Sequence, residues 1–375
     1  MSMSPPRSPV RVVGINFDHM HMGDNLAMAA RHPRVEVIGL WDHDPQRVEP
    51  VRRKLNLPES VRFEDWRACL ETARPDLVLL CPATAAHAEW VERIAGSGLV
   101  APGGAILLEK PFAANLDQAA RIVRAVEAAG LRLAINWPLA WVPAHITAKR
   151  LIDRGVIGAL REVHYYDGNR GPLWHTAGKA EIDAATVAAQ KPTSWFYRAD
   201  HGGGSLLDYL GYGATLSAWF LNGADPLEVV AMTDRPEGLE VDEQSVTIAR
   251  YAPPLGLSTF QTRWGTFTDP WTHQPQPMCG FTLVGTDGTI SSPDYAPTLR
   301  VQTRDHPEGY DHPVETIEPP HRDPVEYVIH CLDTDAPIEG PLSVVTSWQG
   351  QRLVDAAQRS ARTGRIEPLP GPSRP

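Results

Sequence analysis

The chain has 375 residues, which at roughly 150 residues per domain predicts two domains. Hydrophobic residues make up 42% of it and charged residues 21%, a globular composition that excludes wholesale disorder. The formal net charge is −10 and no run is rich in lysine or arginine, so we do not expect nucleic acid as a partner. The longest apolar stretches are about half of the ~20 residues that cross a bilayer, so we expect no membrane partner and a cytoplasmic location.

The four cysteines, Cys69, Cys81, Cys279 and Cys331, lie far apart in the sequence and form no C-x-x-C pair. This spacing indicates reduced core residues and argues against a zinc ribbon or a disulfide framework. Both ends of the chain are rich in proline and lack apolar periodicity. We therefore predict disordered tails over residues 1–9 and 367–375.

Short apolar runs alternate with amphipathic helical stretches through the first part of the chain. The β-type runs are 10–14, 35–40, 77–81, 105–108 and 131–136, and the helical stretches are 46–55, 85–95 and 116–129. Such alternation is typical of a parallel sheet whose two faces are covered by helices. Residues 10–136 are therefore predicted to form a doubly wound, Rossmann-type α/β domain.

The pattern changes after Trp137-Pro138. Longer β-type runs follow at 160–166, 227–233, 245–251, 257–264 and 281–284, with helical stretches at 144–154, 206–220, 324–332 and 344–361. Because few helices separate these strands, residues 137–366 are predicted to form an α+β domain with a mostly antiparallel sheet and helices on one face.

A degraded glycine motif follows the first predicted strand. Gly14 stands where a Rossmann fold turns toward a helix that faces a pyrophosphate. In G-x-G-x-x-G register, Asn16 and His19 replace the second and third glycines. Asn16 can adopt positive φ, whereas His19 would prevent the close packing that the third glycine permits, so this motif alone is a weak signal.

Asp42 ends the second predicted strand and is a candidate for the two ribose hydroxyls of a dinucleotide. A carboxylate at that place repels a 2′-phosphate and favours NAD over NADP. A helix cap or a solvated turn is the alternative for Asp42. The nearby cluster of Asp18, His19, His21 and Asp24 has a spacing that supports metal binding only poorly, because residues two apart do not face each other on a helix. We expect no metal there.

Two motifs carry a family resemblance. Glu109-Lys110-Pro111 ends the strand at 105–108, and Gly202-Gly203-Gly204-Ser205-Leu206-Leu207-Asp208-Tyr209-Leu210-Gly211-Tyr212 opens the helix near 206. Together they resemble the Gfo/Idh/MocA family of oxidoreductases over nearly the whole chain. The resemblance implies a nicotinamide cofactor, sugar, polyol or sugar-derivative substrates, and an open-faced sheet domain that often joins subunits into a homodimer or homotetramer. It also implies further cofactor-binding residues beside Gly14, Asn16, His19 and Asp42, namely Phe17, Asp18, Pro82, Ala83, His87, Glu109 and Lys110.

Lys110, Asp208 and Tyr212 are the predicted catalytic residues. Lys110 ends a strand at the sheet edge where ligands bind in open α/β folds, and its ammonium can stabilise a developing alkoxide. Asp208 and Tyr212 lie four residues apart and share one helix face. The family usually has histidine at position 212; a tyrosine there resembles the glucose-fructose oxidoreductase branch, and its phenol needs a nearby cation to lower its pKa. A surface role for Lys110 and a packing role for Tyr212 are the alternatives.

The helical glycines Gly211 and Gly213 cost roughly 1 kcal/mol each relative to alanine, which suggests that a cofactor or substrate approaches this face. The predicted substrate-binding residues are Asn136, Trp137, Trp195, Arg198 and Tyr212.

The sequence therefore favours an NAD(P)-dependent dehydrogenase that moves a hydride between a sugar-like hydroxyl carbon and nicotinamide. An NAD-dependent lyase or glycosidase that oxidises its sugar transiently would use the same residues. The degraded glycine motif leaves a non-catalytic NAD-binding protein as a third interpretation.

Overall fold

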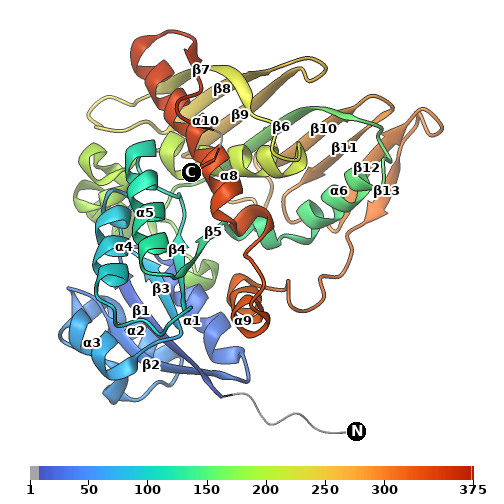
Figure 1. The fold of residues 1–375 in the computed structure, drawn as a ribbon. Helices are drawn as coiled ribbons and strands as arrows, with labels where there is room; N and C mark the ends of the chain where they lie inside the picture. Colours follow the sequence, from blue (N-terminus) through green and yellow to red (C-terminus); the bar gives the residue numbers. More distant parts are fainter. Residues whose placement is uncertain (1–7, 373) are drawn as a thin grey trace, which may run out of the picture.

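The computed structural model describes residues 8–372 and 374–375, and these form two sheets (Figure 1). The N-terminal sheet has five parallel strands in the order β2-β1-β3-β4-β5. They are β1 (Val10–Phe17), β2 (Val35–Trp41), β3 (Leu77–Cys81), β4 (Ala105–Glu109) and β5 (Arg132–Asn136). Every residue of β3 and β4 is buried, because helices cover both faces of the sheet.

The helices of this domain are α1 (His21–Arg31), α2 (Pro45–Lys54), α3 (Trp66–Ala73), α4 (His87–Gly96) and α5 (Leu116–Ala128). Asp44, Asp65 and Asn115 cap the N-termini of α2, α3 and α5 through their side-chain oxygens, which satisfies backbone N–H groups that a helix start leaves unpaired. The predicted doubly wound α/β fold is confirmed. Strand order reverses between β1 and β3, so a crevice for ligands opens at the carboxyl ends of these strands.

The second sheet has nine strands in the order β13-β12-β11-β10-β6-β9-β8-β7-β14. Neighbours are antiparallel except β6 and β9, which are parallel. The strands are β6 (Leu160–Asn169), β7 (Pro226–Asp234), β8 (Gln244–Tyr251), β9 (Leu257–Trp264), β10 (Gly280–Gly285), β11 (Gly288–Pro293), β12 (Thr298–Thr303), β13 (Tyr310–Pro313) and β14 (Glu367–Pro368).

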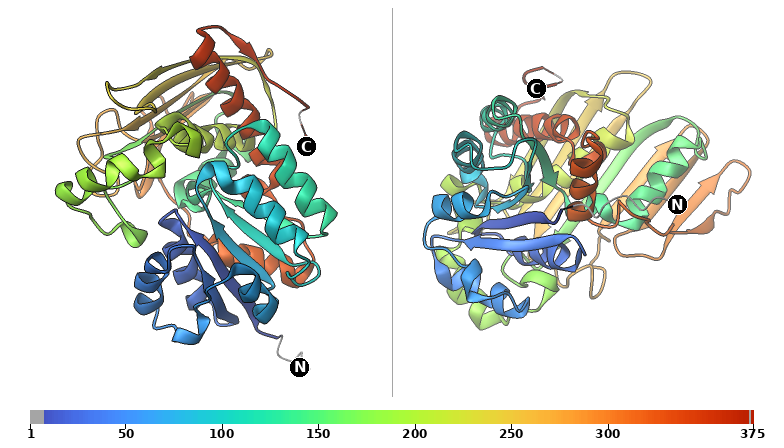
Figure 2. Two further views of the ribbon diagram at one scale, coloured as in Figure 1. Left: turned by 90° about the vertical axis from the view of Figure 1, so that its left-hand side faces the viewer. Right: turned by 60° about the horizontal axis from the view of Figure 1, so that its bottom comes forward.

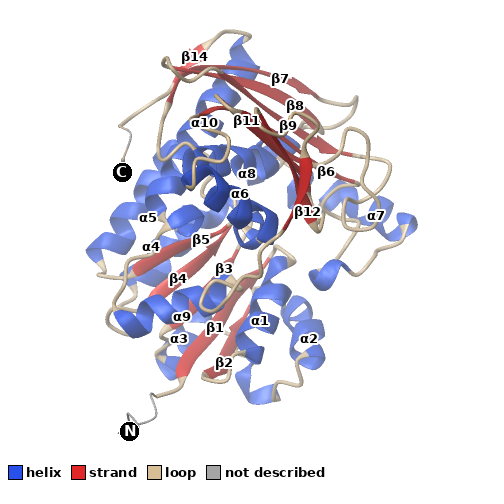
Figure 3. Cartoon of the chain, turned by 90° about the vertical axis from the view of Figure 1, so that its right-hand side faces the viewer, coloured by secondary structure: helices blue, strands red, loops and turns tan. Residues whose placement is uncertain are grey.

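Helices pack on one face of this sheet, as predicted (Figure 3). They include α6 (Pro143–Asp153), α8 (Ser205–Phe220) and α10 (Val344–Thr363), while α7 (Ala184–Gln190) and α9 (Pro324–Thr334) lie outside this layer. Along β8 the inner side chains are buried and the alternate ones are exposed. The opposite face of the sheet is therefore open.

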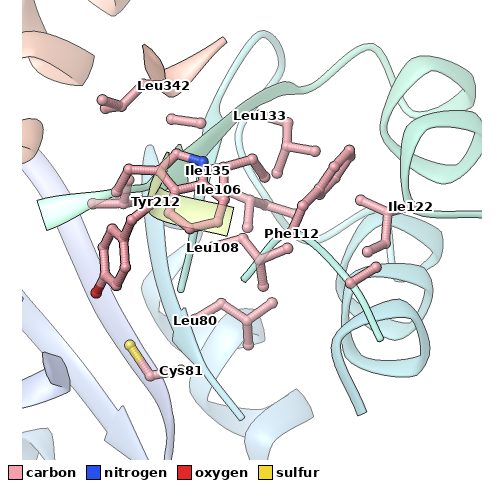
Figure 4. Packing of buried hydrophobic residues seen from close by; sticks show 14 of the residues in the cluster. Leu80, Cys81, Ile106, Leu108, Phe112, Ile122, Leu133, Ile135, Tyr212 and Leu342 are labelled. Atoms are coloured by element: carbon pink, nitrogen blue, oxygen red, sulfur yellow. The ribbon is translucent and has the colours of Figure 1, made fainter. Parts of the chain in front are cut away.

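Helix α10 also joins the two domains. It packs on α8 and on α5 (Figure 2), and Gln351 and Asp355 accept hydrogen bonds from the backbone N–H groups of Ala113 and Leu116. Helix α8 is buried along almost its whole length because it lies between the second sheet and the Rossmann domain. The buried apolar residues of both domains form one continuous cluster, and Figure 4 shows part of it, with Tyr212 of α8 and Ile106 and Ile135 of the parallel sheet among its members.

The C-terminal segment differs from the predicted disordered tail. Residues 367–368 form β14 beside β7, Arg352 donates to the carbonyl of Pro370, and Trp348 donates to that of Pro372. Proline has no N–H but keeps its carbonyl, so a proline-rich segment can still be held by side-chain donors. Of the predicted N-terminal tail, residues 1–7 lie outside the described part, and the Ser8 carbonyl accepts a hydrogen bond from Arg34.

Candidate active site

A pocket of about 420 Å³ lies between the carboxyl edge of the parallel sheet and the second sheet. The Rossmann domain contributes His19, His21 and Lys110, and the second domain contributes Asp208 and Tyr212. The other predicted coenzyme residues, which come from β1 and from the carboxyl ends of β1 to β4, do not line this pocket.

Strand β1 extends through Phe17, so the glycine-motif positions 14 and 16 are at the end of a strand. At Gly14, an added Cβ would meet Met22 Sδ at 3.1 Å and Leu40 Cδ2 at 3.2 Å, so this glycine allows α1 to pack closely on β1 and β2. Asn16 has φ 62°, the left-handed conformation that its glycine-like position requires. Its Oδ1 atom is buried and has no hydrogen-bond partner, so it is free to accept a hydrogen bond from a hydroxyl or amide group of a bound dinucleotide.

Asp42 is buried at the end of β2. Its Oδ2 accepts a hydrogen bond from the Phe17 N–H at 2.5 Å and its Oδ1 accepts one from Asp44 at 2.8 Å. Burial raises the pKa of this carboxyl, and the two backbone donors oppose that rise. Asp42 therefore braces the β1 loop, and each oxygen keeps a second lone pair that a ribose hydroxyl could use.

Asp18 links the two loops that border the crevice. It pairs with Arg47 and accepts a 3.2 Å hydrogen bond from the Ala83 N–H, which places Pro82 and Ala83 beside the β1 loop. The Asp18 carbonyl accepts a 3.1 Å hydrogen bond from Trp195 Nε1. The segment containing Trp195 thus reaches from the second domain to the coenzyme loop.

His87 faces the protein interior. It is fully buried, and its two ring nitrogens lie 3.3 Å from the carbonyls of Phe112 and Pro82. Burial lowers its pKa to about 4. His87 therefore fixes the loops after β3 and β4 through their carbonyl groups.

Lys110 and Asp208 form a buried ion pair between the two domains. Asp208 is in the first turn of α8, and Lys110 follows β4. The Lys110 ammonium also lies 5.2 Å from the ring centroid of Tyr212 and 5.7 Å from that of Tyr209. These contacts exclude a surface position for Lys110, and they hold its charge at the pocket wall.

Tyr212 lines the same pocket, but its electrostatic environment differs from the prediction. Burial and then the Asp208 charge raise the pKa of this phenol well above its usual value. The Lys110 ammonium faces the ring of Tyr212 and forms its ion pair with Asp208. It therefore does not lower the pKa of the phenol. The raised pKa keeps the phenol of Tyr212 protonated, so its hydroxyl can donate a hydrogen bond to a ligand.

The space beside the helical glycines Gly211 and Gly213 is filled by aromatic side chains. The sequence-based expectation that a cofactor or substrate approaches these glycines is therefore wrong. A Cβ at Gly211 would lie 2.3 Å from Trp137 Cη2, and a Cβ at Gly213 would lie 2.8 Å from atoms of Phe260 and Tyr165. Trp137 stacks edge-on against Tyr212 at 5.4 Å and donates to Ser347 at 3.1 Å. Trp137 is consequently a packing residue of the domain interface, and it does not line the pocket.

The other predicted substrate residues divide into two groups. Asn136 lines the pocket and donates to Glu109 at 3.1 Å and to Asn25 at 3.0 Å. Trp195 stacks on Phe196 above the coenzyme loop, and Arg198 is solvent-exposed and paired with Asp200. Neither Trp195 nor Arg198 lines the pocket.

Several pocket residues were not predicted as site residues from the sequence. They come from loops and strand ends far apart in the chain, and include Trp141, Asp167, Lys179, Trp271, Asp294, Tyr295 and Arg322. Asp24 and His175, which the sequence offered only as weaker candidates, line the pocket as well. Burial lowers the pKa of His175 to about 4 and that of Lys179 to about 8. The Lys179 ammonium lies 3.8 Å from the Tyr295 ring centroid. No local motif marks these residues, since only the fold brings them together.

Family models match both domains of this molecule. Residues 10–137 match a model described as an oxidoreductase family with an NAD-binding Rossmann fold, and residues 145–291 match the GFO/IDH/MocA C-terminal domain. The chain belongs to the Gfo/Idh/MocA family. Its N-terminal domain is thus an NAD-binding Rossmann domain, and the orphan Asn16 Oδ1, the close-packed Gly14 and the buried Asp42 fit that coenzyme.

Curated relatives share part of the chain. The dTDP-3,4-didehydro-2,6-dideoxy-alpha-D-glucose 3-reductase of Actinomadura kijaniata is 31% identical over 46% of this chain and 45% of its own length. The inositol 2-dehydrogenase of Paracoccus denitrificans is 30% identical over 40% of this chain and 41% of its own length. The chain thus spans less than half the length of these two relatives.

Solved structures show the same fold over the whole chain. The aldose-aldose oxidoreductase of Caulobacter crescentus, complexed with glycerol, has a TM-score of 0.76 at 18% identity, with 97% of this chain and 100% of that chain covered. A levoglucosan dehydrogenase in complex with NADH and levoglucosan has a TM-score of 0.75 at 17% identity, with the same coverage. Among the described residues, the helices are all too short or too polar to span a membrane.

Proposed function

We propose that this chain is a dehydrogenase that transfers a hydride between a hydroxyl-bearing carbon of a sugar, polyol or sugar derivative and NAD. The buried Lys110–Asp208 pair at the wall of the 420 Å³ pocket carries this proposal. NAD, when bound, accepts the hydride at its nicotinamide. The relatives named above act on sugars or inositol, which supports the substrate class.

The residues that would hold NAD surround the crevice between β1 and β3. They are Gly14, Asn16, Phe17, Asp18, His19, Asp42, Pro82, Ala83, Glu109 and Lys110. His87 would support this group only through the loop backbones. Residues 10–136 would form the coenzyme domain and residues 137–366 the substrate and oligomerisation domain.

Lys110 is the residue that we assign to the reacting oxygen. Its ammonium can hold the substrate hydroxyl and stabilise the negative charge that develops on oxygen as the hydride leaves. Asp208 keeps this lysine oriented through their ion pair. Tyr212, protonated, can donate a second hydrogen bond to the same oxygen, and Asn136 can bind a neighbouring hydroxyl.

NADH formation tests the proposal directly. The wild-type protein is mixed with NAD and a panel of sugars, cyclitols and sugar acids, and NADH absorbance is followed. We expect at least one substrate to give net NADH, and Lys110→Met to remove that activity. The control is Lys54→Met, which changes an exposed lysine of α2. If no substrate gives net NADH, transient oxidation by a lyase or glycosidase becomes the better description, and product analysis with trace NAD would detect it.

We also propose that the open face of the second sheet joins copies of the chain into a homodimer or homotetramer. Met232 of β7 pairs with Val246 of β8, and both are exposed, as are Ile248 and Leu257. Contiguous exposed apolar side chains mark interaction surfaces. Light scattering should report an oligomer for the wild type and a smaller species for Ile248→Lys.

We also propose a cytoplasmic location, which the buried free cysteines support.

A further inference from the structure

The strongest unassigned cluster is a group of two imidazoles and a carboxylate at the base of the pocket. His19 precedes α1, His21 is the first residue of α1, and Glu109 is the last residue of β4. Their candidate ligand atoms lie within 4.8 Å of one another. We expected no metal from the sequence because residues two apart do not face each other on a helix. The third member, Glu109, is 88 residues from His21 along the chain, and only the fold brings it to the histidines.

Distances within the cluster suit metal coordination. The Glu109 Oε1 atom lies 2.8 Å from His21 Nδ1 and 4.0 Å from His19 Nδ1. Ligand atoms around a tetrahedral zinc ion with bonds of about 2.1 Å are separated by roughly 3.4 Å, so the observed values bracket that separation. The 4.0 Å gap would close by a small rotation of either ring.

The charge balance of Glu109 supports the same conclusion. This side chain is fully buried, and its hydrogen-bonding partners are an imidazole of His21 and the amide of Asn136. The adjacent cation Lys110 is paired with Asp208. A buried carboxylate needs a counter-charge, and a divalent cation held by His19 and His21 would supply it.

A third imidazole faces the same pocket. His175 Nδ1 is buried without a hydrogen-bond partner, and its ring packs against Trp271. Asn136 and Asn25 form a hydrogen-bond chain behind Glu109, the kind of supporting contact that orients a metal-ligating carboxylate. The cluster therefore has ligands, a supporting shell and an open side.

We propose that His19, His21 and Glu109 form a binding site for a divalent transition metal such as zinc or cobalt. Two histidines and one glutamate form the ligand set of several catalytic metal sites that keep an open position. The open side faces the pocket that Lys110 lines. If the proposed dehydrogenase function holds, a metal there would polarise the substrate oxygen; metal binding itself does not depend on that function.

Three features of the site oppose a cation. His19 Nδ1 accepts a 3.2 Å hydrogen bond from the His21 N–H, and His21 Nδ1 makes a 2.8 Å hydrogen bond with Glu109 Oε1; coordination at both Nδ1 atoms would replace these two bonds. The N-terminus of α1 carries roughly half a positive charge, and the full negative charge of Glu109 outweighs it. A second cluster, Asp18, Asp42 and His43, is a poorer competitor because Asp42 already binds backbone N–H groups and Asp18 binds Arg47.

Cobalt titration of the full-length, untagged protein tests the site without NAD or substrate. The protein is freed of metal with a chelator, and Co²⁺ binding is followed by calorimetry and by visible absorption. We expect one Co²⁺ per chain, a raised melting temperature, and affinity reduced about 100-fold in His21→Ala and in Glu109→Gln. His43→Ala is the matched control and should bind Co²⁺ like the wild type.

Three results would overturn the proposal: a wild-type protein that binds no Co²⁺ or Zn²⁺ at millimolar concentration, wild-type affinity in His21→Ala, or loss of binding in His43→Ala. Because His21 is partly exposed, its alanine variant is expected to fold, and circular dichroism checks this. If it does not fold, Glu109→Gln decides the matter by the same affinity criterion. Failure of metal binding would leave the NADH assay unaffected, so the two proposals can fail separately.

Discussion

Gly211 of α8 lies directly against Trp137, so that a Cβ at position 211 would come within 2.3 Å of Trp137 Cη2. No rotation of a methyl group relieves such a contact. The indole must therefore shift when residue 211 gains a side chain.

Gly211→Ala is expected to destabilise the protein by about 1–3 kcal/mol, the usual cost of overpacking a core. Trp137→Phe removes the outer ring atoms that would clash, so the double variant should lose less than the sum of the two single variants. Denaturant unfolding measures these terms. Gly96→Ala is the control, because nothing lies within 4 Å of a Cβ at that helical position. If the losses of stability in Trp137→Phe and Gly211→Ala were simply additive, the direct packing of Trp137 on Gly211 would be contradicted.

Lys110→Met should have two separable effects. Turnover should fall at least 100-fold, the lower end for loss of a positioned proton-transfer group. Stability should fall by about 3 kcal/mol, because Asp208 is left as an unpaired charge. In Lys110→Met/Asp208→Asn the stability should recover while turnover does not. Wild-type turnover in the single variant would exclude Lys110 from the chemistry.

Tyr212→Phe tests the protonated phenol. Because burial keeps the pKa of Tyr212 well above its usual value, the hydroxyl does not titrate in the working range. The variant should therefore show a reduced kcat with an unchanged shape of the pH–rate profile, and a nearly unchanged melting temperature. Disappearance of a basic limb from the profile would instead identify the phenol as the titrating group.

The buried His87 should make the stability of the protein sensitive to acid. Its pKa falls from 6.5 to about 4 in the folded protein, so the unfolded chain binds a proton more readily. The stabilisation from neutral His87 is complete above pH 6.5 and is lost as the pH falls to about 4, on the order of 3 kcal/mol in total. In His87→Gln, stability should vary less with pH over this window. His43→Gln, at an exposed histidine, is the control and should keep the wild-type slope.

The position of Asp42 leads us to expect a preference for NAD over NADP. A carboxylate beside a 2′-phosphate costs on the order of 1–4 kcal/mol, depending on the local dielectric, so NAD should bind more tightly than NADP. Asp42→Asn should narrow that preference about tenfold in calorimetric titrations. Asp44→Asn, two residues away at the cap of α2, should leave it intact. Equal affinities in the wild type would show that Asp42 acts only as the brace of the β1 loop.

The fold could be predicted from the sequence because its signals are local. The apolar runs 77–81 and 105–108 and the helical spacing at 116–129 each correspond to an element of the parallel sheet domain. Strands β11, β12 and β13 were missed because they are short and contain glycine, proline or charged residues. Their order depends on successive pairing, of β11 with β10, of β12 with β11 and of β13 with β12, which no single segment encodes.

The site was less predictable. Lys110 and Asp208 were found because each stands in a recognisable motif, and the structure pairs them. The direction of the Tyr212 pKa shift was wrong because it depends on burial and on which group Lys110 faces. Trp195 and Arg198 come from a plausible segment, yet the chain directs one to the coenzyme loop and the other to solvent. Asp167 and Asp294 could not be found, since they reach the pocket only after the second sheet is assembled.

The ion pair between Lys110 and Asp208 also bears on how the two halves of the molecule assemble. Each half carries one charge of the pair, both side chains are buried in the assembled molecule, and each charge finds its partner only when the two domains dock in the native orientation. A docking shifted by a few ångströms would leave both charges without partners in an apolar interface, at a cost of several kcal/mol. The residues proposed for catalysis thus also act as a check on domain assembly: a chain that has docked incorrectly is penalised in stability before it could ever turn over a substrate.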